Sequence, residues 1–425
     1  MSFYALPCFS GRPICQLAHH RGCFLLIISV LLFHGTLQSG EGPRLIEVRD
    51  SVQAWSGRLL AKDDKYSWIM TETGGVWQLE TAKLTGFRVI ADEFRTVTPA
   101  KLYSKLRAEV PEEYEVAQSA RFIVAAGSGR ASTYAAYLER IYRDVVHFYQ
   151  SHGVEVSEPT VPMAVLLFSD QYEFRAYCER DNTRWSDDLR GYYSLQTNRV
   201  ALFDDRSTDW SSAETVEETA SRQPAHLQGL TETAARSLSK VSPRTLDTLV
   251  HEVVHQIGYN TGVHSRFGRN PQWLVEGLAM HLETPDSRTR RGHSRSETAT
   301  PINAERLAWF RDEYTSRQAA GDLAGLIASE DLFTSSPFDA YSLSWALTSF
   351  LGSENSGERR KQFADYLALL KTRDSMEPYS AEDRLLDFQQ CFGDIALLEV
   401  ELWRHVESLE TAKGDILLYT ANDRD

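Results

Sequence analysis

Cysteine is scarce in this chain, with five among 425 residues. Three of the five lie within the first 23 residues, so only Cys178 and Cys391 belong to the rest of the chain. No two cysteines have the C-x-x-C spacing, which excludes a cysteine-based zinc site. In an exported protein, Cys178 and Cys391 would either form a disulfide or remain two separate buried thiols, and the sequence does not decide between the two.

Positive charge is also in deficit. The chain has 45 Lys and Arg against 59 Asp and Glu, which gives a formal net charge of -14. Nucleic acids and anionic membranes bind basic surfaces, so neither is expected as the main partner. The remaining composition, 42% hydrophobic and 24% charged, is ordinary for a globular protein that buries a core. The length suits two or three domains.

Acidic residues are absent from the first 40 residues. Arg12 and Arg21 precede a mostly apolar run from Cys23 to Leu37, which polar and small residues follow. This order is typical of a secretory signal, and the run is shorter than the roughly 20 residues that span a bilayer. We therefore predict a signal peptide over residues 1–39 and an exported protein, periplasmic or extracellular. An uncleaved signal would instead act as a membrane anchor.

Three parts follow the predicted signal. Residues 40–115 predict a small β-rich N-terminal module, residues 116–355 alternate strand and helix patterns, and residues 356–425 predict a helical extension. The individual predictions are strands at 66–70, 76–79, 87–90, 121–126 and 163–168, a strand pair or one bent edge strand at 191–203, a loop or weakly helical insertion at 205–240, an exposed loop at 286–300 and a helix at 385–409.

One predicted helix carries residues with metal chemistry. Ser242 followed by Pro243 predicts its start, and apolar residues then recur on one face. His251, Glu252 and His255 fall elsewhere on the helix and form the pattern H-E-x-x-H. A separation of one turn places the two imidazoles on the same side, within reach of one ion. Glu252 could take a proton from a metal-activated water and pass it to the leaving nitrogen.

A third ligand is predicted 21 positions after His255, at Glu276. A loop that reverses the chain precedes the helix of Glu276, and Gly277 would let that helix approach its neighbour closely. A glutamate in an apolar helix face is costly to bury unless a cation pairs with it. We therefore predict that His251, His255 and Glu276 hold one Zn²⁺ ion, with a fourth position open for water.

These motifs resemble a known group. H-E-x-x-H followed by W-L-x-E-G-x-A resembles the gluzincin metallopeptidases of the MA clan, and the Y-x-x-S-W-A-L segment is similar in particular to the DUF1570 family. The resemblance covers roughly residues 119–355. It implies an α+β metallopeptidase domain at 116–355, with a small mixed sheet over the H-E-x-x-H helix and a helical subdomain. It also implies that His251, His255 and Glu276 are ligands and that Glu252 is the general base and acid.

The resemblance leaves two positions of the site unassigned. One turn after Glu276, where a carboxylate would orient His251, the residue is Met280. The donor that stabilises the oxyanion is predicted to be Tyr341, which lies about as far beyond the motif as the transition-state tyrosine of similar enzymes. Packing in the core is the alternative role of Tyr341. Five other candidates compete with it: Tyr192, Tyr193, Tyr259, His264 and His281.

The favoured function is zinc-dependent hydrolysis of peptide bonds in a peptide or protein substrate. Gly191–Phe203 resembles the edge strand that lies along the cleft of gluzincins, where an extended peptide could add as a further strand, or it is an ordinary edge strand. Two other functions stay open. The chain could be a zinc-binding but inactive envelope or surface interaction protein, or it could hold a structural zinc closed by His264 or His281. The intact Glu252 favours the enzyme.

Overall fold

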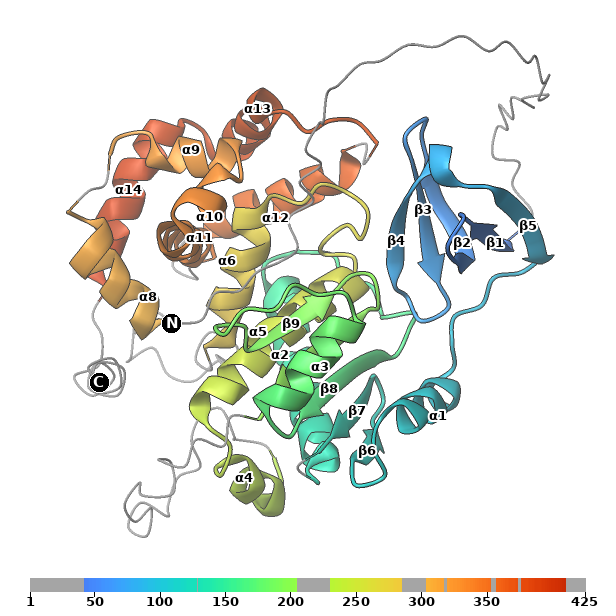
Figure 1. Cartoon of the computed structure of the whole chain (residues 1–425). Helices are drawn as coiled ribbons and strands as arrows, with labels where there is room; N and C mark the ends of the chain where they lie inside the picture. The colour runs from blue at the N-terminus through green and yellow to red at the C-terminus, as the bar shows by residue number, and fades with distance from the viewer. Residues whose placement is uncertain are drawn as a thin grey trace, which may run out of the picture.

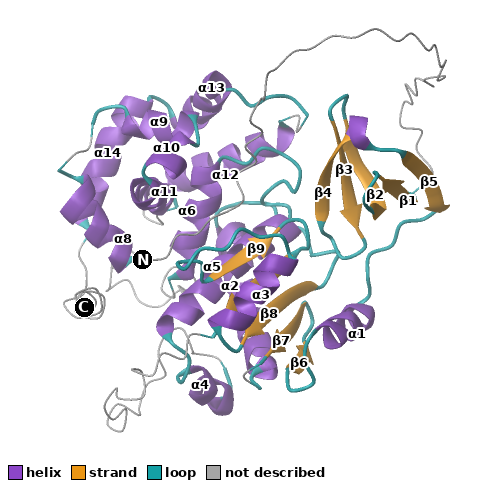
Figure 2. Ribbon diagram, viewed as in Figure 1, coloured by secondary structure: helices purple, strands orange, loops and turns teal. Residues whose placement is uncertain are grey.

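A computed structural model describes residues 42–127, 129–204, 230–284, 303–316, 319–352, 357–373 and 376–409. The predicted signal, the loop at 286–300 and most of the insertion at 205–240 lie outside these residues. Within the described part, no helix is long and apolar enough to cross a membrane. The chain is a mixed α+β protein, β-rich at its N-terminal end and helical at its C-terminal end (Figures 1 and 2).

The N-terminal module is a five-stranded antiparallel sheet, drawn in blue in Figure 1. Its strands are β1 (Leu45–Arg49), β2 (Ala54–Lys62), β3 (Tyr66–Thr71), β4 (Val76–Glu80) and β5 (Gly86–Ala91). Across the sheet they lie in the order β4-β3-β2-β1-β5. Successive side chains point to opposite faces, and each face has a small core, one around Ile69 and the other around Met70. The strands predicted at 66–70, 76–79 and 87–90 are confirmed.

A second sheet of five strands forms the middle of the molecule. Its strands are β6 (Glu115–Gln118), β7 (Phe122–Ala126), β8 (Met163–Phe168), β9 (Gly191–Ser194) and β10 (Arg199–Phe203). Across the sheet they lie in the order β6-β7-β8-β10-β9. The three inner strands are parallel, and the two edge strands are antiparallel to their neighbours. The sheet is therefore mixed, as predicted, and the segment 191–203 is a strand pair with β9 at the edge.

Helices cover both faces of the central sheet (Figure 2). On one face lie α1 (Pro99–Glu109) and α3 (Gln171–Arg180), and on the other lie α2 (Ala131–Ser151) and α5 (Pro243–Asn260). Along β10, Val200 and Leu202 belong to the core on the α5 face, whereas Ala201 and Phe203 belong to the core on the α3 face. This alternation explains why β10, like β7 and β8, is almost entirely apolar.

The helices of the C-terminal part pack around a core that contains Trp273 and Trp345. After α4 (Glu232–Leu238) and α5 they are α6 (Gln272–Glu283), α8 (Ala304–Trp309) with the π-helical turn η4 (Phe310–Tyr314), α9 (Asp322–Ala328), α10 (Asp331–Ser335), α11 (Pro337–Leu351), α12 (Gly357–Thr372), α13 (Ala381–Phe392) and α14 (Ile395–Ser408). Helix α11 contains the whole Y-x-x-S-W-A-L segment that begins at Tyr341.

The single helix predicted at 385–409 is wrong, because α13 and α14 are separate. Gly393 has a φ of 83°, in the left-handed region that glycine tolerates, and α13 ends there. The Asp394 side chain accepts hydrogen bonds from the backbone of Ala396 and Leu397 and so caps α14. The apolar period continues across the break, which is why the sequence pattern did not reveal it.

The turn between β3 and β4 attaches the N-terminal module to the central sheet. The backbone N–H of Val76 donates to the carbonyl of Leu195 at 2.8 Å. Gly75 lies so close to the β9–β10 turn that an added Cβ would stand 2.0 Å from the carbonyl oxygen of Gln196. Only a glycine therefore allows this backbone contact.

Asn198 and Arg266 reinforce the same contact. Asn198, in the β9–β10 turn, donates from Nδ2 to the carbonyl of Thr73 at 3.2 Å. The guanidinium of Arg266 donates to the carbonyl of Gly74 and also to the carbonyl of Tyr259 near the end of α5. The module is thus bonded to the turn of the edge strand pair and to the end of the H-E-x-x-H helix.

We expect Gly75→Ala to weaken this attachment, because the new methyl group must push two backbones apart. The free energy of unfolding should fall by about 1–3 kcal/mol, the usual cost of overpacking, as measured by denaturant titration. The control is Gly325→Ala in α9, where an added Cβ meets nothing within 4 Å. Equal stability of the two variants would contradict the close contact.

Candidate functional site

Helix α5 holds the H-E-x-x-H motif in the interior of the protein. The hydroxyl of Ser242 accepts from the backbone of Thr245 at 3.1 Å and caps the helix, as predicted. Both faces of α5 are buried around the motif, so the polar face is not open to solvent. The Nε2 of Gln256 donates to the carbonyls of Ala164 at 3.1 Å and Asn198 at 2.9 Å. These bonds tie α5 to the central sheet directly beneath the motif.

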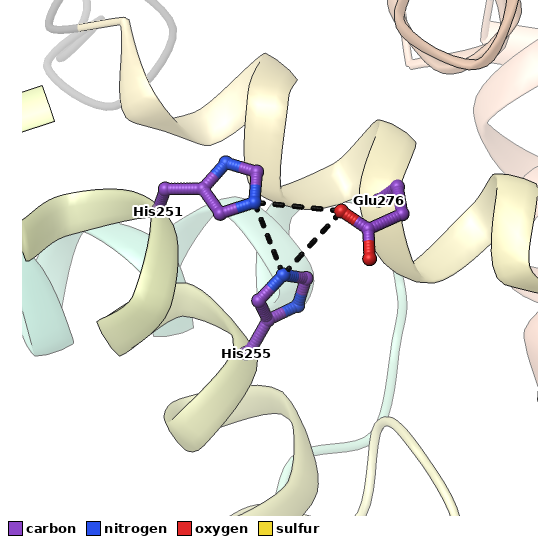
Figure 3. Close-up of side chains that lie close together, drawn as sticks. All are labelled: His251, His255 and Glu276. Atoms are coloured by element: carbon purple, nitrogen blue, oxygen red, sulfur yellow. Dashed lines mark hydrogen bonds and ion pairs between the residues drawn. The ribbon is translucent and has the colours of Figure 1, made fainter. Parts of the chain in front are cut away.

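His251, His255 and Glu276 converge on one point (Figure 3). The Nε2 atoms of His251 and His255 are 3.2 Å apart. The Oε2 of Glu276, on α6, is 3.4 Å from Nε2 of His251 and 3.6 Å from Nε2 of His255. Atoms that bind one zinc ion tetrahedrally at about 2.1 Å are about 3.4 Å apart. The three side chains therefore form a group that could hold a metal ion.

The burial of Glu276 supports a cation at this point. The residue is 1% exposed, and neither carboxylate oxygen accepts a hydrogen bond from the described residues. A carboxylate in such a place is unfavourable unless a cation compensates it. Burial raises its pKa, but the charges of His255 and His251 outweigh burial and lower the pKa of Glu276 to about 2. The carboxylate is thus held in its charged form, which is the form that binds a metal.

The pKa values of the two residues at the start of the motif are both raised, for different reasons. Burial opposes charge on His251, but the carboxylates of Glu276 and Glu283 outweigh it and raise the pKa of His251 to about 10. Burial also raises the pKa of the Glu252 carboxyl, more than the nearby imidazoles and the backbone of Tyr193 lower it. A carboxyl whose pKa is raised is suited to accept a proton and release it again. The contact with Tyr193 also places Glu252 beside the edge strand β9.

The carboxylate that orients His251 is Glu283, a residue that the sequence analysis did not find. Its Oε2 accepts from Nδ1 of His251 at 2.9 Å, which directs Nε2 toward His255 and Glu276. The other oxygen of Glu283 accepts from Nδ2 of Asn303 at 2.5 Å. Glu283 lies seven residues after Glu276, two turns along the same helix face. The residue one turn after Glu276 is Met280, so the sequence leaves this role open, although a spacing of seven residues is an equally readable signal.

Gly277 lets α6 approach a neighbouring helix closely, as expected, and that neighbour is α11. An added Cβ at Gly277 would stand 2.2 Å from the hydroxyl of Thr348 and 2.5 Å from the carbonyl of Ser344. Both belong to α11, so the close neighbour of α6 at this glycine is α11. Glu276 is thus held between α5 on one side and α11 behind it.

One comparison with known proteins covers the segment in which this group of side chains lies. Residues 245–377 match a family model whose description is "Protein of unknown function (DUF1570)". This segment of the chain is a DUF1570 match. It contains the metal group, Glu252, Glu283 and Tyr341, so the predicted resemblance to DUF1570 is confirmed for these residues. The central sheet precedes the matched segment. The comparison with curated proteins gave no match.

Tyr341 lies inside the DUF1570 segment, on α11. It is 6% exposed, and its ring centroid lies 5.4 Å from that of Phe333. The Cζ atom of the Arg306 guanidinium lies 5.8 Å from the same ring centroid. These contacts show how the ring is held, and its role as oxyanion donor stays a prediction.

Two of the competing tyrosines, Tyr192 and Tyr193, lie on opposite faces of the central sheet. Tyr192 belongs to the core on the α3 face, and its hydroxyl donates to Asp181 at 2.7 Å, so it points away from α5. Tyr193 lies on the α5 face and stacks on Tyr259, with ring centroids 5.7 Å apart. Its hydroxyl donates to Asn198 at 2.9 Å. Tyr192 is therefore the weakest of the competitors.

The competing histidines are not members of the metal group. His264 packs against Tyr259, and burial lowers the pKa of its imidazole to about 3. His281 lies beside Phe148 of α2, at a centroid distance of 5.5 Å. Among the described residues only His251, His255 and Glu276 form a group of metal-binding side chains. Within the part of the chain that the structure describes, the group that could hold a metal ion therefore consists of three side chains.

We expect Glu283→Gln in the DUF1570 segment to weaken metal binding, because an amide supports the ligand form of His251 less well than a carboxylate. Loss of such a supporting residue typically lowers metal affinity about 10–100-fold. Competition with a chromophoric chelator measures this directly. The control is Glu232→Gln, the same substitution on the surface of α4, where the carboxylate pairs with Arg236. Unchanged affinity in Glu283→Gln would exclude the supporting role.

Proposed function

We propose that this protein is a zinc-dependent peptidase with a gluzincin-like catalytic domain. The observation that carries the proposal is the buried triangle of two imidazoles and one carboxylate, with a further carboxyl, Glu252, next to it on α5. Catalytic zinc sites use three protein ligands and keep the fourth position open, whereas structural sites close it with another Cys or His. The set of ligands supports the catalytic type.

The donor atoms fit zinc and other late transition metals better than magnesium or calcium. Imidazole nitrogen suits zinc and other late transition metals, while magnesium and calcium prefer oxygen ligands alone. When bound, zinc would lower the pKa of a water molecule and polarise a carbonyl group. His251 and His255 would hold the cation on α5, and Glu276 would neutralise part of its charge. Glu283 keeps His251 in the tautomer that presents Nε2 to the metal.

Glu252 would carry the proton in the reaction. It accepts a proton from the attacking water and releases it to the nitrogen of the leaving amine, so the carboxylate returns to its starting form. Burial keeps its pKa above the ordinary value, which favours this second step. A bound metal cation would oppose that shift, so the carboxylate would be ready to accept the proton at the start.

The edge strand β9 would hold the substrate. It is an outer strand of the central sheet, and the backbone of Tyr193 in it lies against Glu252. An extended peptide that adds to such an edge is fixed by backbone hydrogen bonds, whatever its side chains. This arrangement supports a peptide as the substrate, because only a polypeptide offers that ladder of donors and acceptors beside the general base.

We expect one zinc ion per chain in the purified protein, and no hydrolysis of a peptide library after treatment with a chelator. Glu252→Gln should keep the zinc but lose activity by roughly 10²–10⁴-fold, since an amide cannot accept the proton. His255→Ala should lose the metal itself. Zinc content and single-substrate kinetics measure both effects. A wild-type protein that binds zinc but cleaves nothing would instead support an inactive binding protein.

We also expect Tyr341→Phe to retain zinc and stability while lowering kcat by roughly 10–10³-fold, the effect of one lost transition-state donor. The control is Tyr366→Phe, which removes the hydroxyl of a second buried tyrosine, on α12. If Tyr341 only packs against Phe333, both variants will turn over substrate like the wild type.

A further inference from the structure

One buried arginine lacks the carboxylate partner that other buried arginines of the fold have. Three arginines of the described residues are buried, namely Arg140, Arg306 and Arg384. Arg140 pairs with Asp144 at 3.3 Å, and Arg384 pairs with Glu330 at 3.1 Å. Arg306 is the most enclosed of the three, at 6% exposure, and none of the described carboxylates forms an ion pair with it.

The surroundings of Arg306 compensate its charge only weakly. Its Nε is enclosed and has no hydrogen-bond partner among the described residues. Its one described contact with a ring is with Tyr341 at 5.8 Å, close to the limit of about 6 Å for a cation–π interaction. Arginine is rarely buried without a partner, because desolvation of an unpaired charge is costly. This position therefore favours an anion that comes from outside the fold.

A second residue, Trp309, also joins the helix of Arg306 to α11. Trp309, at the end of α8, donates from Nε1 to Asp339 of α11 at 3.1 Å. Its ring also packs on Phe338 at 4.8 Å. The second oxygen of Asp339 accepts from the hydroxyl of Ser336 at 2.6 Å. Asp339 thus accepts hydrogen bonds from Trp309 and Ser336. The contacts of Trp309 join α8 to α11 without the side chain of Arg306.

Hydrogen bonds connect the position of Arg306 to the metal ligands. The side chain of Asn303 accepts from the backbone N–H of Arg306 at 3.1 Å. The same side chain donates to Glu283, and Glu283 accepts from His251. The start of α8, at Asn303, therefore lies two hydrogen bonds from His251.

We propose that Arg306 binds a carboxylate group of the substrate. A guanidinium presents paired N–H donors that match the two oxygens of a carboxylate, and such charge-assisted bonds are strong in a desolvated place. The substrate class is then a peptide with a carboxylate near the cleaved bond. The carboxylate is either the C-terminal group or the side chain of Asp or Glu. As a statement about substrate, the proposal rests on the proposed peptidase function.

Binding of short peptides to the full chain tests the proposal without turnover. The protein is the zinc-loaded Glu252→Gln variant, and the method is isothermal titration calorimetry. The first pair of probes is N-acetyl-trialanine as the free acid and as the amide. The second pair is N-acetyl-Ala-Glu-Ala-amide and its Gln counterpart. One acid is expected to bind about tenfold or more tightly than its neutral partner, the effect of a charge-assisted hydrogen bond. The pair that shows the preference identifies the source of the carboxylate.

Substitution of Arg306 then assigns the preference to this residue. Arg306→Gln should abolish it, and Arg306→Lys, which keeps the charge but loses the paired donors, should reduce it. If Arg306→Gln does not fold, the Lys variant still gives the comparison. The control Arg384→Gln removes a buried arginine that already has a partner, and it should leave the preference intact.

Two results would overturn the proposal: equal affinity for acid and neutral probes in both pairs, or an acid preference that survives in Arg306→Gln and Arg306→Lys. Failure of the peptidase function looks different. In that case the wild-type protein cleaves no peptide, while the acid preference and its dependence on Arg306 persist.

Discussion

The compensation of one buried negative charge organises the centre of this molecule. Glu276 lies at 1% exposure between the imidazoles of His251 and His255, and this arrangement is unfavourable without a cation to balance it. The residue after Glu276 on α6, Gly277, lets α11 pack closely against that helix. The interior here is arranged around charge as well as around apolar packing.

The parts of the fold outside the metal group position it from two sides. On the side of the sheet, Gln256 bonds α5 to two backbone carbonyls, and the N-terminal module presses its β3–β4 turn against the β9–β10 turn. On the helical side, Asn303 holds Glu283, and Glu283 holds His251. The module therefore contacts the same strand pair that we propose to bind substrate, and the N-cap of α8 contacts Glu283, the residue that orients His251.

Charge balance also distinguishes binding groups from structural ones. Arg140 and Arg384 are buried with carboxylates of the chain itself, as structural ion pairs are. Among the described residues, Arg306 has no carboxylate partner, and the two carboxylate oxygens of Glu276 have no hydrogen-bond partner. In both cases the missing charge points to a ligand, a cation for Glu276 and an anion for Arg306, and the two positions are connected through Glu283 and Asn303.

The sequence by itself determined the local features, because they depend on spacing along one element. The start of α5 at Ser242, the histidines one turn apart and most strands follow from periodicity and capping. What the tertiary structure decided were contacts between elements far apart in sequence. The support of His251 by Glu283, the break at Gly393, the approach of α11 to Gly277 and the isolation of Arg306 all depend on which segments meet in space. No periodicity encodes those meetings, since they are set by packing of the whole chain.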